Sequence, residues 1–592
     1  MIRIRRRTFH QKTTYIMLGL VLLASLLIRV YNIIRFPNLN SAFDPWIHIQ
    51  VADRLINSGK IDLEYHGANF AVHIILAYLK LLTGTSLLSV AKYCPILLGT
   101  VATLSVMVFT QKLTKSYSIA IITGILLGLV ADRFVFATNL IWPEILGLIF
   151  MNFSLYPWVE HLSSRKPLKK SSFSFVFFLL LLLTHRLTVL IFILFLIPIS
   201  IALLIWQKQN IMSILFAVFS VGSWYLWITN VDSEFSSLIE RMIGRISRVT
   251  VIFPALPLMV VALVLISVVI LVGLFLLVRN QEVLNSFEEI EPDTRIFVLW
   301  ALSIALLIFL ISDAIASPSG TQYFGTVNQT QLIFKLIPKV IIFLFSFLGI
   351  LFLFKYFRTW QSVFLVVWIV IFLIAFGVLL FLPLGGAGYD LFRFMAYMYF
   401  PLCISAAIGI YYGFKLSNLS LQRAVAVVFI VSIVSMIPIG ATSAFMTPEQ
   451  GAYTQNWLDA RDYAALEWMG DNINSYSVVL ADKRYDFAFT SMVDPENSHI
   501  TIESEELHLY YNITHQKIAK KFVRQLHFDG EWHEFYILID STMLDYGLLF
   551  DHQLYRPLTI DEYDEYFYVL YLELVYYSNG ISLFHLVRSR LT

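Results

Sequence analysis

Long apolar runs dominate this sequence and limit the folds that it can adopt. Runs of about 17 to 25 apolar residues, the length that a helix needs to cross a bilayer, recur along residues 15–446. Hydrophobic residues make up 58% of the chain and charged residues 14%, which is too much apolar surface for the interior of a water-soluble globule. The sequence therefore predicts an α-helical polytopic membrane protein. We place about thirteen spans, near 15–35, 90–111, 117–131, 134–157, 173–185, 187–206, 210–229, 251–278, 295–315, 333–354, 361–384, 394–414 and 424–446.

Basic residues set the predicted orientation of these spans. Residues 1–14 form a basic tail, which predicts a cytoplasmic N-terminus. The segment 173–206 is interrupted only by His185-Arg186, and its length favours two helices over one. With an odd number of spans, residues 36–89 form the first external loop of the transmembrane domain 15–446, and residues 447–592 lie outside. The short loops favour the plasma membrane of a prokaryote, and the net charge of +2 is too small to indicate a nucleic-acid partner.

The composition changes after residue 447, and the patterns there are those of a folded domain. The sequence predicts a helix over 456–470 and another near 514–526, with strands at 477–480 and 536–539. The terminal segment 574–584 predicts a hairpin that turns at Asn579-Gly580. We expect a small external α/β domain that rests on the outer face of the membrane.

Asp44 is the first candidate for catalysis at that face. It belongs to Phe43-Asp44-Pro45-Trp46-Ile47-His48, which follows the first span, and Pro45 is suited to open a helix that Asp44 caps and Gly59 ends. A carboxylate there can deprotonate an acceptor or hold a metal ion, although a plain helix cap is the alternative. His48 lies one turn further along and can bind a metal or a phosphate, or simply form a hydrogen bond at the interface.

Glu144 is the second candidate. It ends the segment Asn139-Leu140-Ile141-Trp142-Pro143-Glu144, and a carboxylate near the outer end of a membrane helix needs a partner or water. Asp44 with a shared cation is one such partner, and exposure of the carboxylate to water is the alternative.

The third candidate is the predicted outside loop 384–390, which is followed by Arg393. Its three glycines let the backbone approach a ligand closely, and an arginine can bind a phosphate in a bidentate manner. Tyr389, Asp390 and Arg393 are therefore predicted substrate-binding residues. A flexible turn with an interfacial arginine is the alternative.

Phe43-Asp44-Pro45-Trp46 resembles the acidic motif in the first external loop of oligosaccharyltransferase catalytic subunits, which belong to the GT-C superfamily of membrane glycosyltransferases. Residues 139–144 are similar to the second acidic motif of that group, with Glu144 at its last carboxylate. The resemblance implies an inverting transfer of a sugar from a polyprenyl-phosphate-linked donor, with Asp44 and Glu144 as catalytic residues and as ligands of a divalent cation, Mg²⁺ or Mn²⁺. It extends in layout over the spans and the external domain.

The chain departs from that pattern at three places. Trp142 stands where a metal-binding carboxylate is expected, and residues 326–329 lack the glutamate that oligosaccharyltransferases carry. The Trp-Trp-Asp-Tyr-Gly motif that reads the acceptor is absent, and residues 481–486 occupy the corresponding stretch. The acceptor, a protein, a glycan or a lipid, therefore stays open.

Three other functions compete with this prediction. An oligosaccharyltransferase-like enzyme of protein N-glycosylation differs in accepting a peptide sequon. A flippase or transporter of a lipid-linked sugar is expected to place charges or broken helices near the middle of the bilayer. A noncatalytic assembly subunit would tolerate Asp44→Ala.

Overall fold

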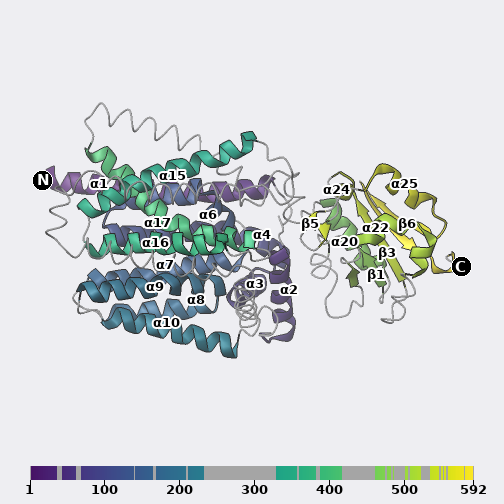
Figure 1. Ribbon diagram of the computed structural model, residues 1–592, viewed down its shortest axis with the longest axis horizontal. Helices are drawn as coiled ribbons and strands as arrows, with labels where there is room; N and C mark the ends of the chain where they lie inside the picture. The colour runs from purple at the N-terminus through teal and green to yellow at the C-terminus, as the bar shows by residue number, and fades with distance from the viewer. Residues whose placement is uncertain are drawn as a thin grey trace.

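The computed structural model consists of a helical bundle and a smaller domain that contains both helices and strands (Figure 1). The predicted spans near 251–278, 295–315 and 424–446 lie outside the described residues. The described residues are 2–35, 43–61, 69–138, 141–163, 168–207, 211–231, 329–356, 359–381, 387–416, 460–473, 477–481, 485, 501–503, 507–521, 534–545, 549–550, 553–554, 558–578 and 580–590.

The bundle is built from helices that follow the predicted apolar runs closely. Its described helices are α1 (Ile2–Arg35), α2 (Phe43–Ser58), α3 (Phe70–Thr83), α4 (Leu87–Thr114), α5 (Tyr117–Ile125), the π-helical turn η2 (Leu126–Val130), α6 (Asp132–Ala137), α7 (Pro143–Ser163), α8 (Leu168–Leu182), α9 (Arg186–Gln207), α10 (Ile211–Asn230), α15 (Gln329–Tyr356), α16 (Thr359–Phe381) and α17 (Ala387–Leu416).

Three of the described helices are long and apolar enough to cross a membrane, at Thr13–Tyr31, Leu87–Thr114 and Ala396–Lys415. Several shorter apolar helices lie beside them, including α3 and the apolar parts of α8, α9 and α10. The described residues thus form a mostly helical membrane protein, and the number of about thirteen spans stays a prediction.

Segment 173–206 forms two helices, as its length indicates. Helix α8 ends at Leu182 and α9 begins at Arg186, so His185 lies in the turn between them. The predicted span 134–157, in contrast, is wrong as a single helix, because α6 ends at Ala137 and α7 begins only at Pro143. Proline lacks an N–H and restricts the residue before it, so Pro143 starts a new helix.

The segment 36–89, predicted as the first external loop, contains two described helices. Helix α2 begins at Phe43 and ends at Ser58, where Gly59 has a positive φ of +65° and donates its N–H to the Leu55 carbonyl at 3.0 Å. The predicted end of this helix at Gly59 is confirmed, but the helix begins at Phe43 and not at Pro45, so Asp44 lies in its first turn and not at its N-cap. Helix α3 was not predicted, because its 14 residues are too few for a span.

Two glycines let α15 and α17 pack closely. A Cβ atom added at Gly349 would lie 1.7 Å from the Ser405 carbonyl oxygen, and one at Gly409 would lie 2.1 Å from that of Phe345. The Ser405 hydroxyl also donates to the Ser346 carbonyl at 2.9 Å. Small residues at a crossing give membrane helices van der Waals contact that larger ones would prevent.

The C-terminal domain contains a five-stranded mixed sheet in the order β2-β1-β3-β7-β6. Strands β1, β2 and β3 are parallel, and β7 pairs antiparallel with both β3 and β6. The elements are α20 (Ala460–Asn472), β1 (Ser477–Leu480), β2 (Thr501–Glu503), α22 (Leu507–Asn512), β3 (Glu534–Asp540), α24 (Ser541–Asp545), β4 (Leu549–Phe550), β5 (Gln553–Leu554), α25 (Ile560–Tyr568), β6 (Leu572–Ser578), β7 (Ile581–Leu586) and η4 (Arg588–Arg590).

The elements predicted for this domain correspond to α20, β1, β3 and the terminal hairpin, whereas β2, α22, α24 and α25 were not predicted. The terminal hairpin forms between β6 and β7, and Gly580 has a φ of +91° at its turn. The helix predicted near 514–526 agrees with helical residues 516–521, while residues 522–526 lie outside the described part.

The C-terminal domain lies beside the end of the bundle that carries α2, and the N-terminus lies at the opposite end (Figure 1). Trp46 of α2 contacts Tyr463 of α20, with ring centroids 5.8 Å apart. Their side chains are 2% and 9% exposed, so this contact is buried where the two domains meet.

Candidate functional site

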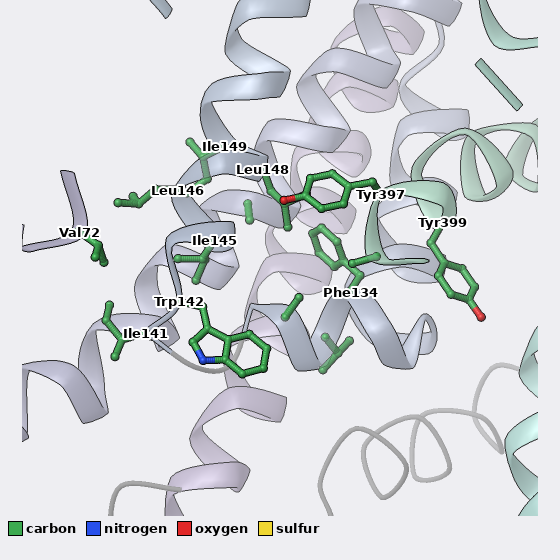
Figure 2. Packing of buried hydrophobic residues seen from close by; sticks show 14 of the residues in the cluster. Val72, Phe134, Ile141, Trp142, Ile145, Leu146, Leu148, Ile149, Tyr397 and Tyr399 are labelled. Carbon is green, nitrogen blue, oxygen red and sulfur yellow. The ribbon is translucent and has the colours of Figure 1, made fainter. Parts of the chain in front are cut away.

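The start of α7 carries Glu144 into the core of the bundle. Ile141 and Trp142 precede it and Ile145 follows it, and all three side chains are buried among apolar residues (Figure 2). Proline at the first position and an acid in the first turn are favourable for a helix, because the unpaired N–H groups there attract negative charge. Glu144 is only 2% exposed, so exposure of its carboxylate to water is excluded.

His185 is the partner of Glu144. Its Nε2 lies 3.5 Å from Glu144 Oε1, and both side chains are almost fully buried. The imidazole reaches the carboxylate because the turn between α8 and α9 lies beside the start of α7. The turn also binds α3, since the Ala71 N–H donates to the Leu183 carbonyl at 3.2 Å.

The other ring nitrogen of His185 shows which tautomer is present. The backbone N–H of Thr188 donates to Nδ1 at 3.3 Å, so this nitrogen carries a lone pair and the ring proton of the neutral form lies on Nε2. The Nε2–H therefore faces the carboxylate of Glu144. This polarity orients the histidine as a donor to Glu144.

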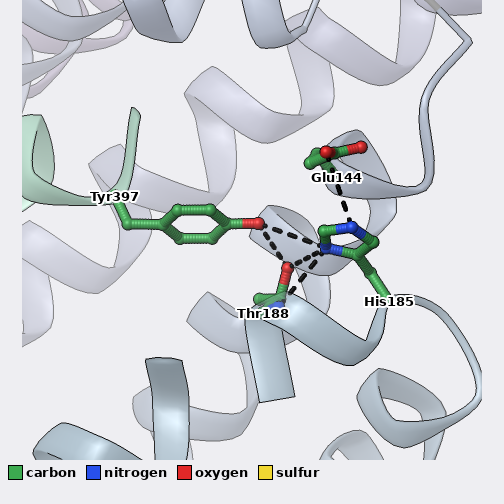
Figure 3. A network of polar contacts seen from close by, with 4 residues as sticks. All are labelled: Glu144, His185, Thr188 and Tyr397. Atoms are coloured by element: carbon green, nitrogen blue, oxygen red, sulfur yellow. Dashed lines mark hydrogen bonds and ion pairs between the residues drawn. The ribbon is translucent and has the colours of Figure 1, made fainter. Parts of the chain in front are cut away.

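Two hydroxyls extend the network to α17 (Figure 3). The Thr188 hydroxyl lies 2.7 Å from His185 Nδ1, to which it donates, and it accepts a short hydrogen bond from the Tyr397 phenol. The phenol oxygen is itself 3.5 Å from Nδ1. Since Thr188 and Tyr397 are fully buried, Tyr397, Thr188 and His185 form one chain of buried hydrogen bonds, and the His185 ring joins it to the Glu144 carboxylate through the 3.5 Å contact.

The predicted phosphate-binding residues lie on the same helix as Tyr397. Helix α17 begins at Ala387, so Tyr389, Asp390 and Arg393 belong to its first two turns and not to a loop, which corrects the prediction for 387–390. The helix extends beyond the apolar run, which is why hydrophobicity alone placed its start too late. Arg393 precedes Tyr397 by four residues, which is one helical turn. The side chains of all three predicted residues lie outside the described part.

Asp44 lies in the first turn of α2, and its side chain is outside the described part. Trp46 and His48 are described, and both are buried. His48 Nδ1 lies 2.8 Å from Nε2 of His73 on α3, so one of the two rings donates to the other. This pair and the contact of Trp46 with Tyr463 hold the helix that carries Asp44.

The described residues alone do not form a divalent cation site. No group of three or more His, Cys, Asp or Glu side chains comes together in the part of the chain that the structure describes. Of the two predicted metal ligands, only Glu144 has a described side chain, and its Oε1 faces a histidine N–H. The requirement for Mg²⁺ or Mn²⁺ therefore stays a prediction, and no chemical step below depends on it.

His185, Thr188, Tyr397 and His73 were not identified as site residues from the sequence. A single polar residue inside an apolar run was the available signal, because such a residue in a membrane segment needs a polar partner. Which partner it meets depends on helix packing, which the sequence pattern does not give.

No protein-family model matches the sequence, and no curated protein matches it either. Among solved structures, the chain is similar to the apo form of the Archaeoglobus fulgidus oligosaccharyltransferase, with 13% sequence identity and a TM-score of 0.53, over 90% of this chain and 70% of that chain. The oligosaccharyltransferase AglB from Archaeoglobus fulgidus, in complex with an inhibitory peptide and a dolichol-phosphate, gives 14% identity and a TM-score of 0.52 over the same shares.

ArnT from Cupriavidus metallidurans, bound to undecaprenyl phosphate, matches 98% of both chains at 11% identity, but its TM-score of 0.39 is too low to support an argument. At sequence identities as low as those of the two oligosaccharyltransferase structures, the similarity shows a shared fold and does not show a shared activity or substrate. The chain therefore shares the fold of the Archaeoglobus fulgidus oligosaccharyltransferase.

Proposed function

We propose that this protein is a membrane glycosyltransferase that transfers a sugar from a polyprenyl-phosphate-linked donor to an acceptor on the extracytoplasmic face. The observation that carries this proposal is the buried carboxylate of Glu144, held by His185 in a chain with this fold. A buried acid with an oriented partner is typical of a functional site in a membrane protein. Dolichol-phosphate in the complex of the similar AglB supports a lipid-phosphate donor.

The proposed reaction is a single displacement at the anomeric carbon of the sugar. Asp44 accepts the proton of the acceptor nucleophile, the new bond forms on one face of the sugar, and the bond from the sugar to the phosphate oxygen breaks on the other. The configuration inverts, and the phosphate leaves with the polyprenyl lipid. Arg393 stabilises the departing phosphate, and Glu144 acts as the second carboxylate of the site.

An oligosaccharyltransferase-like enzyme is the second candidate, because the two similar structures that share the fold are oligosaccharyltransferases. The position of Tyr485 speaks against recognition of a sequon in the manner of oligosaccharyltransferases. This residue lies in the stretch that corresponds to the missing acceptor motif. Its phenol is fully buried and lies 2.5 Å from Asp462 Oδ1 and 2.6 Å from Asp540 Oδ2. It is therefore directed into the C-terminal domain and away from an acceptor.

A transporter is less well supported. Glu144 and His185 stand at helix starts, next to α3 of the predicted first external loop, whereas a transporter is expected to hold its charges at broken helices near the middle of the bilayer.

The test is transfer of radiolabelled sugar from a polyprenyl-phosphate pool to acceptors that include a sequon peptide, with and without EDTA. Asp44→Asn and Asp44→Ala are compared with Asp53→Asn, a control on the same helix whose carboxylate binds Lys80 at 3.1 Å. We expect transfer to fall about 100-fold or more in both Asp44 variants and to persist in the control. Full activity of the Asp44 variants would rule out Asp44 as the base, and sensitivity to EDTA would support a metal ion.

A further inference from the structure

Arg29 is a charged residue near the C-terminal end of the apolar segment of α1, yet it is buried inside the bundle. It lies on α1 within the predicted first span, and its side chain is only 1% exposed. An arginine near the end of a membrane helix normally extends its charge to the interface. The Arg29 side chain is instead directed into the bundle, where its guanidinium loses contact with water. This energetic cost indicates that Arg29 has a specific role.

The guanidinium joins α1 to the end of α6. Its Nη1 donates to the Ser25 carbonyl at 2.8 Å and to the Ser25 hydroxyl at 2.6 Å. Nη2 donates to the Thr138 hydroxyl at 2.5 Å, and Nε donates to the Thr138 carbonyl at 3.4 Å. These acceptors are neutral, and in the described part of the chain no carboxylate forms an ion pair with Arg29.

Helix α4 leaves room for this contact at Gly99. A Cβ atom added there would lie 2.0 Å from Arg29 Nε and 2.5 Å from the Thr138 carbonyl oxygen. One turn further along α4, the Thr103 hydroxyl lies 3.0 Å from the Ser25 hydroxyl. Three helices therefore meet around the guanidinium with no space for a larger residue.

Thr138 is the point from which the chain runs to Glu144. Only two residues separate it from Ile141, so the chain between the two Cα atoms spans at most about 11 Å. Trp142 and Glu144 follow directly and are buried. A displacement of Thr138 would therefore be transmitted to the start of α7 and to the contact of Glu144 with His185.

We propose that Arg29 is a positioning residue: together with Gly99 it fixes Thr138 and so places Glu144 against His185. This inference rests on the proposed function, in which Glu144 acts in sugar transfer. Arg29 makes no contact with Glu144 itself and acts through the backbone of 138–144.

The experiment uses the full chain in detergent, labelled with 5-fluorotryptophan, and follows the ¹⁹F resonance of Trp142, which Trp142→Phe assigns. Arg29→Met and Gly99→Ala are expected to shift or split this resonance, and Arg29→Lys to do so less. Lys112→Met is the control, because Lys112 forms a distant ion pair with Glu160 at 2.6 Å. Thr138→Val removes one acceptor with little change in volume, so it keeps the test open if the other variants fail to fold.

Sugar transfer is measured on the same samples. We expect the kcat of Arg29→Met to fall about 10- to 100-fold with the donor KM unchanged, since misplacement by about 1 Å can slow a reaction that much. An unchanged Trp142 resonance in Arg29→Met, Gly99→Ala and Thr138→Val would overturn the proposal. A raised donor KM in Arg29→Met, with the Trp142 resonance unchanged, would show instead that Arg29 binds the donor phosphate. If the wild type transfers no sugar, the proposed function fails, while the resonance still decides whether Arg29 places this segment.

Discussion

The two predicted carboxylates lie in the first turns of two helices, each of which carries a proline in that turn, but the two helix starts are held by different neighbours. The start of α7 is enclosed by the bundle, where His185, Thr188 and Tyr397 connect Glu144 to α9 and α17. The start of α2 lies at the end of the bundle, where it contacts Tyr463 of the C-terminal domain and His73 of α3.

This difference indicates a division of labour within the site. Packing inside the bundle determines the position of Glu144. The helix that carries Asp44, in contrast, contacts the C-terminal domain through Trp46 and Tyr463. A change in the C-terminal domain should therefore affect Asp44 and leave Glu144 in place.

The largest effect is expected for His185→Ala. This variant removes the ring that faces Glu144 and breaks the link to Thr188, and disruption of a buried pair by loss of one partner destabilises a protein by about 3–5 kcal/mol. We expect sugar transfer to fall about 100-fold or more, and His185→Gln, which keeps a donor, to retain more activity. Radiolabelled transfer and thermal unfolding in detergent measure the two effects. His515→Ala, an exposed histidine of the C-terminal domain, is the control, and wild-type transfer in His185→Ala would contradict the role of the buried network.

Local features of the site were predictable from the sequence. The end of α2 was predictable because Gly59, which has a positive φ, directly follows its last residue, whereas Pro45 placed its start two residues too late. The length of segment 173–206 likewise predicted two helices. Cys94 and Cys403 stand in apolar runs, a pattern that favours buried thiols over a disulfide, and both are buried and free.

Contacts between distant segments were not predictable. Glu144 and His185 are 41 residues apart, and Tyr397 reaches Thr188 from 209 residues away. A tyrosine in an apolar run is normally interpreted as a core residue, and only the packing of α9 against α17 reveals its hydrogen bond. The break before Pro143 was missed because the apolar composition continues through it.

A smaller effect is expected for Tyr463→Ala, which weakens the contact between the C-terminal domain and α2. An aromatic pair contributes about 0.5–1.5 kcal/mol beyond its buried area, so transfer should fall up to about 10-fold. Tyr463→Phe keeps the ring and should remain close to the wild type. Steady-state kinetics and limited proteolysis between the domains provide the measurements. The ¹⁹F resonance of Trp142 should stay unchanged in Tyr463→Ala, and a shift there would show that the two helix starts are not held separately.

The smallest effect is expected for His73→Gln. The amide can still form a hydrogen bond with His48, whereas His73→Leu leaves a buried ring nitrogen without that partner and should lower the free energy of unfolding by about 1–3 kcal/mol. Transfer should change little in His73→Gln, because α2 keeps both its contact with α3 and its contact with Tyr463.

The donor KM of His48→Gln tests whether His48 also binds the phosphate, which is the other role predicted for it. Since Nδ1 of His48 is engaged with His73, only Nε2 can face a donor phosphate, and a donor KM raised in His48→Gln but unchanged in His73→Gln would show that it does. Equal donor KM values in the two variants would instead show that the pair of histidines serves to hold α2 in place, as Tyr463 does.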